Sequence, residues 1–386
     1  MTAAPEPLTP ASVPADGILP AGEIEAMCSS GAIAVQRPLA AGQVQPASLD
    51  LRLGHVAYRI RASFLPGPGA CVADKLDSLK LHEISLVEGA VLETGCVYLV
   101  PLQESLALPP SIAAAANPKS STGRLDVFTR VISDRAREFD QIGAGYEGPL
   151  YAEISPRTFS ILVRQGSRLS QLRLRRGNVA VPPEEMRRLQ AETGLVFDAS
   201  GNGAADDPLN DGRGITLSVD LAGDDAGLVG YRAKRHSGLI DVDRAGAYDP
   251  AEYWDPVHVR GDCRIILDPD EFYILASREA VRIPPDYAAE MVPYDPLVGE
   301  FRVHYAGFFD PGFGAHEAGG HGARAVLEVR SHEVPFILEH GQIIGRLVYE
   351  RMAQRPTTLY GQALGSSYQR QGLKLSKHFK MPGMPA

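Results

Sequence analysis

Two short stretches of the sequence carry residue types that could act on a phosphorylated substrate. The first, Lys119-Ser120-Ser121-Thr122-Gly123-Arg124, places two cations, three hydroxyl groups and a glycine within six residues. Such a cluster suits a polyanion such as a triphosphate, because cations and backbone N–H groups both donate to phosphate oxygens. The second, from Gly148 to Ser155, holds one carboxylate, Glu153, among residues typical of a strand. Partial burial would raise its pKa toward the range of a general base.

Together the two stretches are the minimal equipment for hydrolytic chemistry on a nucleotide. Each is weak evidence alone. A Ser-Ser-Thr-Gly run is more often a turn than a phosphate site. A single glutamate on a strand usually faces solvent or pairs with an arginine.

The composition predicts a soluble globular protein. The 386 residues are enough for two domains, 44% of them are hydrophobic, and the mean hydropathy is −0.10. No run of about 18 apolar residues occurs, and the Ala- and Pro-rich start lacks the basic residues of a signal peptide. We therefore expect no membrane association and a cytoplasmic location. The net charge of −9 argues against nucleic acid as a partner.

The sequence gives little support for a bound zinc ion. Four cysteines are scattered without Cys-x-x-Cys spacing, which argues against both a disulfide framework and a closed zinc site. The chain also lacks the His-x-Glu and Pro-Cys-x-x-Cys signature of the zinc nucleobase deaminases. His316 and His321 lie in a glycine-rich stretch, which we interpret as an exposed loop and not as a metal site.

The order of apolar runs and turn residues predicts a mainly β protein with few short helices. Residues 18–33 are expected to form a helix, and Gln45 to Gly54 to form a strand that ends at a glycine. Antiparallel strands should continue to Asn178, followed by a helix over 182–194 and a polar, glycine-rich stretch. The predicted organisation is a disordered tail 1–17, a first domain 18–200, a linker 201–212 and a second domain 213–386.

The second half of the chain repeats the first. Four pairs of landmarks share one offset, because 273−98, 285−110, 328−153 and 341−166 all equal 175. Common turn residues would not fix one offset, so we infer an internal duplication. In the second copy, residues 294–299 lack the serine pair and the cations of 119–124. Glu328, the counterpart of Glu153, is interpreted as a relic or as a structural ion-pair partner.

These motifs resemble those of dCTP deaminases, a branch of the dUTPase-like superfamily. The resemblance rests on five segments: Gln45 to Gly54, Lys119 to Leu125, Gly148 to Glu153, Gly166 to Leu172, and an arm from Tyr360 to Ser376. It implies two tandem distorted β-barrels, assembly in trimer-like rings with active sites at interfaces, and conversion of dCTP and water to dUTP and ammonia without zinc. The usual family member is a single copy, so the duplicated length is a departure.

The resemblance also implies roles for single residues. Glu153 would be the general base, with Ser120 and Arg124 positioning the water and balancing its charge. Other positions implied to contact the nucleotide are Lys119, Ser121, Thr122, Gly123, Ser133, Asp140, Tyr151, Ala152, Gln171, Tyr360, Ser367, Gln371 and Lys374. Ser367 stands where the family usually has lysine. An insertion, 141–144, follows Asp140, whereas the intact Asp-Pro-Gly turn begins at Asp310 in the second copy.

The resemblance further implies Mg²⁺ carried by the triphosphate, dTTP as an inhibitor, and a homo-oligomer. Two alternatives stay open at this point. One is a dUTPase, or a bifunctional enzyme that continues to dUMP, which requires a carboxylate aimed at a water near the α-phosphate. The other is a nucleotide sensor without catalysis, which the degenerate second copy makes conceivable.

Overall fold

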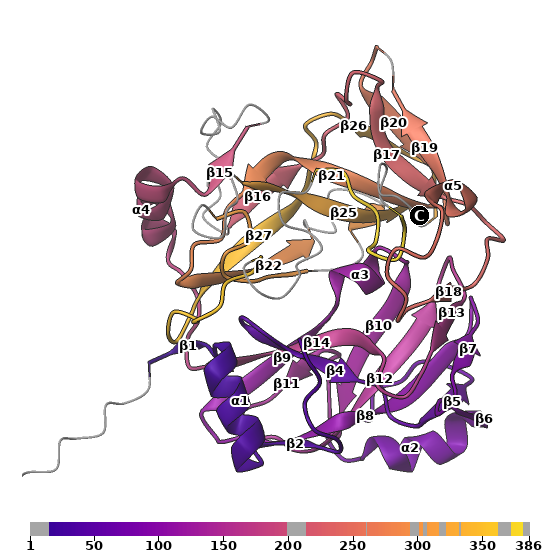
Figure 1. The fold of residues 1–386 in the computed structure, drawn as a ribbon, viewed down its shortest axis with the longest axis vertical. Coiled ribbons are helices and arrows are strands. Elements are labelled where there is room, and N and C mark those ends of the chain that lie inside the picture. The colour runs from indigo at the N-terminus through magenta and orange to yellow at the C-terminus, as the bar shows by residue number, and fades with distance from the viewer. Residues whose placement is uncertain are drawn as a thin grey trace, which may run out of the picture.

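The computed structural model describes residues 15–198, 214–259, 261–293, 301–303, 307–315, 322–331, 333–361 and 372–380. Figure 1 shows two β-rich halves, with the first half of the chain at the bottom of the view and the second half above it. The predicted mainly β architecture with few short helices is confirmed. The predicted linker 201–212 and the residues His316, His321, Ser367 and Gln371 lie outside the described residues.

The first copy consists of three sheets. Its elements are β1 Gly17–Ile18, α1 Ala21–Ser30, β2 Ile33–Val35, β3 Val44–Gln45, β4 Ser48–Arg52, β5 Val56–Ile60, α2 Val72–Leu79, β6 Lys80–Ser85, β7 Ala90–Leu92, β8 Val97–Ala107, β9 Ile112–Pro118, α3 Ser120–Gly123, β10 Val127–Ser133, β11 Gln141–Ile142, β12 Glu147–Pro156, β13 Ile161–Val163 and β14 Arg168–Arg176. One sheet has the order β11-β9-β14-β4-β3, and a second has the order β10-β12-β8-β5-β6. In the third, β13 lies between β7 and β18 (Ile240–Asp241), a strand from the second half.

The second half repeats this topology. Its elements are α4 Pro183–Thr193, β15 Val196–Phe197, β16 Ile215–Ser218, β17 Leu228–Ala233, β18, α5 Pro250–Tyr253, β19 Trp254–His258, β20 Arg264–Leu267, β21 Phe272–Val281, β22 Tyr287–Pro293, β23 Phe301–Val303, β24 Phe308–Phe309, β25 Ala323–Ser331, β26 Phe336–Glu339 and β27 Ile343–Arg351. Its sheets have the orders β19-β17-β21-β25-β23, β24-β22-β27-β16 and β20-β26. The strand β22 lies 175 residues after β9 at both ends, and β27 lies 175 residues after β14 at both ends. The inferred duplication is therefore confirmed.

The helix predicted over 18–33 is shorter than expected. The structure has α1 at Ala21–Ser30, with Pro20 at its N-cap and Gly31 in the left-handed conformation at its C-cap. The flanking residues join sheets instead, because β1 pairs with β14 and β2 pairs with β8. A further helix, α2, lies in the stretch interpreted as antiparallel β with few helices, and Asp74 accepts a hydrogen bond from the Cys71 N–H at its start.

The helix α4 and the strand β15 pack with the second copy, although the sequence interpretation assigned them to the first domain. Here β15 pairs with β21, as β2 pairs with β8 in the first copy. Met186 and Leu189 of α4 belong to the core formed by strands of the second half. We infer that the second copy begins at α4, which takes the place of α1.

One hydrophobic core contains residues of both copies, beside a second core formed by the second half alone. Strand residues of the first copy such as Val100 and Ile154 lie in the same cluster as Trp254, Phe272 and Val326 of the second.

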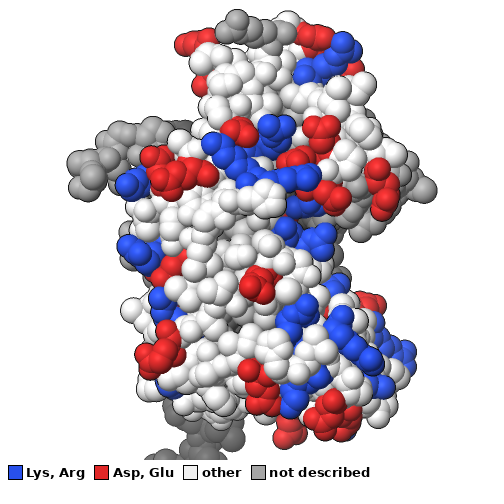
Figure 2. Space-filling model, turned by 90° about the vertical axis from the view of Figure 1, so that its right-hand side faces the viewer, with Lys and Arg blue, Asp and Glu red and all other residues white. Residues whose placement is uncertain are grey.

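Among the described helices, none has both the length and the apolar run that a membrane crossing requires. Figure 2 shows basic side chains gathered in a band across the upper half of one face and in a group at its lower right, with acidic side chains beside both.

A buried ion pair also joins the copies. Arg330 of β25 donates to the carboxylate of Asp126, which follows α3 in the first copy, and Thr158 donates to the same carboxylate at 2.6 Å. Both charged side chains are almost completely buried. Loss of either partner would leave the other charge without its counter-ion in a medium of low dielectric constant.

We therefore expect Arg330→Met to lower the free energy of unfolding by about 3–5 kcal/mol in urea titrations. A matched control is Arg232→Met, because Arg232 pairs with Asp255 at 3.5 Å and both side chains are nearly half exposed. Its cost should stay below about 1 kcal/mol. Equal losses in the two variants would contradict a special role for the buried pair.

A candidate active site between the two copies

The residues 119–124 form a buried turn between two sheets of the first copy. Lys119 caps the short helix α3, and its carbonyl accepts the N–H groups of Thr122 and Gly123 at 2.8 and 3.0 Å. Ser121, Thr122, Gly123 and Arg124 are all buried. This loop, which we call the 119–124 loop, sits at the boundary with the second copy.

Arg124 connects this loop to the second copy. Its guanidinium donates to the carbonyl of Lys374 at 3.0 Å, and its Nε lies 3.9 Å from Oε1 of Glu328 on β25. Arg124 and Glu328 are only 3% and 4% exposed. Thus the cation predicted for the site and the carboxylate of the second copy meet within one chain.

The surroundings of Glu328 suit a proton-transfer role. Burial raises its pKa to about 8, while Arg124 and a backbone N–H act in the opposite direction. The group can therefore both take up and release a proton near neutral pH. Arg330 lies two residues after Glu328 on the same face of β25 and pairs with Asp126, so a second ion pair joins the same two segments next to the Arg124–Glu328 contact.

Cations gather on the other side of the loop. Lys119 forms an ion pair with Asp50, and the guanidinium of Arg168 lies 3.5 Å from the same carboxylate. Burial lowers the pKa of Lys377, and the nearby charges of Lys119 and Arg168 act in the same direction. Three cations around Asp50 make this region electropositive and suited to a polyanion.

Glu153 has different neighbours. It pairs in register with Arg130 on β10, whose Nε lies 3.2 Å from its Oε1. The Arg130 guanidinium also donates to Ser63 at 2.9 Å and lies 3.5 Å from the ring centre of Phe139. Glu153 is 2% exposed. The first copy therefore encloses this carboxylate with its own residues.

The same face of the sheet is covered differently in the two copies. In the first copy, Val72 and Leu76 of α2 pack over this face with Leu99 and Ile132. In the second copy, Ile274 and Val326 of the corresponding face belong to the core shared with the first copy. Hence α2 covers the Glu153 face, whereas the first copy itself covers the Glu328 face.

The two aspartates at the predicted turns are both buried. Asp140 accepts the N–H of Val131 at 2.7 Å, and burial raises its pKa to about 7. Asp310 lies 3.3 Å from the guanidinium of Arg173, which comes from β14 of the first copy. Burial raises the pKa of Asp310, with Asp50 acting in the same direction, so the Asp310 turn lies near the electropositive region.

The remaining predicted residues are spread over several places. Tyr151 packs in the cluster under α2, and Ala152 lies in the shared core. Gln171 is buried on β14, 3.4 Å from the hydroxyl of Ser48. Tyr360 packs against Phe313 beside the Asp310 turn.

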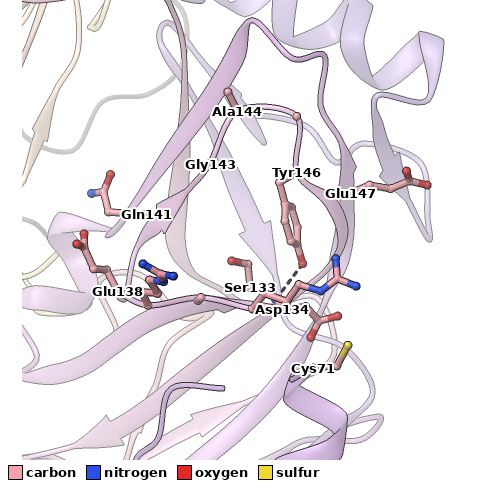
Figure 3. A pocket seen from close by; sticks show the side chains of 13 residues that line it. Cys71, Ser133, Asp134, Glu138, Gln141, Gly143, Ala144, Tyr146 and Glu147 are labelled. Atoms are coloured by element: carbon pink, nitrogen blue, oxygen red, sulfur yellow. Dashed lines mark hydrogen bonds between the residues drawn. The ribbon is translucent and has the colours of Figure 1, made fainter. Parts of the chain in front are cut away.

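Ser133 lines a cavity of about 540 Å³ in the first copy, together with Cys71 and Tyr146 (Figure 3). In it, the Tyr146 hydroxyl accepts the N–H of Asp134 at 3.1 Å. This cavity includes no residue of the 119–124 loop and not Glu328.

The structure adds Glu328, which the sequence analysis interpreted as a relic or a structural ion-pair partner, to the candidates for the site. Its local pattern, Ala-Val-Leu-Glu-Val, matches that of Glu153 at the offset of 175, so a signal was present. Which of the two carboxylates faces the 119–124 loop depends on how the copies pack.

In the part of the chain that the structure describes, no three His, Cys, Asp or Glu side chains are grouped as metal ligands.

Comparison with known proteins supports one family for nearly the whole chain. Residues 183–379 match the model of the 2′-deoxycytidine 5′-triphosphate deaminase (DCD) C-terminal domain, and residues 15–178 match that of the N-terminal domain. The boundary between the two matched ranges lies directly before α4, which begins at Pro183. A crystal structure of 2′-deoxycytidine 5′-triphosphate deaminase from Agrobacterium tumefaciens superposes with a TM-score of 0.82 and 59% identity, over 89% of this chain and 99% of that one.

Two further relatives match a shorter part of this chain at lower identity. A "dCTP deaminase, dUMP-forming" of Beutenbergia cavernae is 31% identical over 193 residues, which are 48% of this chain and 88% of the relative. A "dCTP deaminase" of Haloarcula marismortui is 32% identical over 133 residues, which are 34% of this chain and 65% of the relative.

The raised pKa of Glu328 has a measurable consequence for stability. A carboxyl group whose pKa is higher in the folded than in the unfolded chain stabilises the fold only at low pH, and this contribution is lost as the pH rises through about 8. We expect the melting temperature of Glu328→Gln, relative to that of the wild type, to rise between about pH 5 and pH 8 and then to level off. Glu147→Gln, at an exposed position, serves as the control, and a difference for Glu328→Gln that does not change with pH would refute the raised pKa of Glu328.

Proposed function

The chain belongs to the dCTP deaminase family of hydrolases, and we propose that it converts dCTP and water to dUTP and ammonia at the junction of its two copies. The observation that carries this proposal is the contact of Arg124 in the first copy with the buried Glu328 of the second. It brings the anion-binding loop and a carboxylate of raised pKa together within a single chain.

In this proposal Glu328 takes a proton from a water as the water oxygen attacks C4 of cytosine. The new C–O bond forms, and Glu328 passes this proton to N3 of the ring. Glu328 then takes the proton of the new C4 hydroxyl group and delivers it to the exocyclic amine. The C4–N bond breaks as the C4 carbonyl forms, and ammonia leaves. A carboxyl group with a pKa near neutrality suits both the uptake and the release of the proton. The chemistry of these steps calls for no zinc.

The loop supplies charge and orientation. Arg124 stabilises the ionised form of Glu328, and it would stabilise negative charge that develops on the attacking oxygen. Ser120, at the first position of α3, would orient the water. Lys119, Arg168 and Lys377 form the electropositive region that suits the triphosphate, and Mg²⁺ would be held mainly by phosphate oxygens.

Glu153 is then a structural partner of Arg130, and each chain has one working site. The earlier assignment of the base to Glu153 remains testable, because a neighbouring chain could bring its own 119–124 loop to that carboxylate. Assembly in a trimer-like ring and inhibition by dTTP also stay predictions. The mass of the assembly in solution, with the number of dCTP molecules bound per chain, tests the assembly and the number of sites together.

Relatives named as dUMP-forming suggest the second candidate, a bifunctional enzyme that also removes pyrophosphate. Incubation with dCTP distinguishes the two. Ammonia with accumulating dUTP supports deamination alone, whereas ammonia with dUMP and pyrophosphate supports the bifunctional reaction. Binding of dCTP without any product would support a nucleotide sensor.

We expect Glu328→Gln to lower kcat by at least about 100-fold while dCTP still binds, because the amide cannot accept the water proton. Glu153→Gln should keep kcat within about threefold when rates are normalised to folded protein. Ammonia release and isothermal titration measure the two properties. The reverse pattern, with Glu153→Gln inactive and Glu328→Gln active, would move the base to the first copy and to an interface between chains.

Arg124→Ala should lower kcat by about 10²–10³-fold, because it removes a buried cation from the reacting centre. Arg124→Lys should recover only part of this loss, since a lysine cannot reach Glu328 and the Lys374 carbonyl in the same fork geometry. Ser120→Ala should give a smaller decrease. Wild-type kcat in Arg124→Ala would exclude this arginine from the mechanism.

A further inference from the structure

The C-terminal segment from Lys374 to Phe379 contacts the 119–124 loop at two points. The Lys374 carbonyl accepts from the Arg124 guanidinium at 3.0 Å, and the hydroxyl oxygen of Ser376 lies 2.8 Å from the carbonyl oxygen of Ser121. The Ser376 side chain is buried. Both partners in the loop belong to the stretch that binds substrate in the proposed function.

The segment is itself held by residues 240–254 of the second copy. The N–H of Gly246 donates to the Lys377 carbonyl at 2.9 Å, and the N–H groups of Ala247 and Tyr248 donate to the His378 carbonyl at 2.9 and 3.1 Å. Phe379 packs edge-on against Tyr253 and Trp254, with ring centres 5.4 and 5.9 Å apart. Residues 240–242 in turn pair with β13 of the first copy, so the support spans both copies.

His378 connects this support to the loop. Its buried ring lies with Nε2 2.9 Å from the Val242 carbonyl and with Nδ1 2.9 Å from the Ser376 hydroxyl. A carbonyl only accepts, so Nε2 carries the proton and Nδ1 of the neutral ring accepts. The single Ser376 proton is therefore shared between Nδ1 and the Ser121 carbonyl.

We propose that residues 374–379 form a C-terminal latch that fixes the 119–124 loop, with Ser376 and His378 as positioning residues for the reaction. The inference rests on the proposed function, because it adds residues to that site. Neither side chain needs to touch the nucleotide. Their effect passes through the Ser121 backbone, and so through the position of Ser120 and Arg124 on the same loop.

The test uses the full-length variants Ser376→Ala, His378→Ala and His378→Gln, with Lys380→Ala as a matched control whose side chain is exposed. Ser376→Ala and His378→Ala should each raise KM for dCTP about five- to tenfold, the effect of one lost hydrogen bond, with a smaller change in kcat. The double variant should be no worse than the more affected single one, because the two residues act in one chain of contacts. His378→Gln should stay within about twofold of wild type, since its amide can bridge the same partners.

Hydrogen exchange separates this proposal from the proposed function. Ser376→Ala should speed amide exchange in residues 119–124 even if dCTP proves not to be the substrate, whereas Lys380→Ala should not. If KM and exchange match the wild type in both alanine variants, the latch is refuted. It is also refuted if both variants only lower the melting temperature, with additive losses, while KM and loop exchange are unchanged.

Discussion

The contact of one copy's arginine with the other copy's carboxylate is the constraint on which the rest of the molecule depends. Arg124 and Glu328 are both buried, and burying two ionisable groups is tolerated only where partners are placed accurately around them. The Asp126–Arg330 pair, the shared hydrophobic core and residues 374–379 all act at this boundary. These contacts between the copies together hold Arg124 and Glu328 in place.

The two halves of the duplicated chain differ in what surrounds their corresponding carboxylates. The first copy keeps the 119–124 loop, and its own carboxylate, Glu153, lies beneath α2 and against Arg130. The second copy offers Glu328 on a face that the first copy covers. In the proposed function each copy thus contributes half of one site, so neither half of the chain would be dispensable.

Much of this could be predicted from local patterns. Strands such as β22 and β27 repeat β9 and β14 at a constant offset, and the loop was identified by its own residue types. The face toward which a carboxylate points depends on packing between segments that are 175 residues apart. Glu153 and Glu328 have similar local sequences and differ in what covers them, which no local pattern encodes. The helix α2, which makes that difference, was not predicted, although its buried residues Val72 and Leu76 have helical spacing.

The covalent link between the copies has a consequence for how the site assembles. Where two separate subunits each supply part of a site, dilution dissociates the subunits and removes the site. Here Arg124 and Glu328 belong to one polypeptide, so their encounter is an intramolecular event with a high effective concentration. The pair would form as the chain folds and persist in a single molecule, whatever the level at which the protein is expressed.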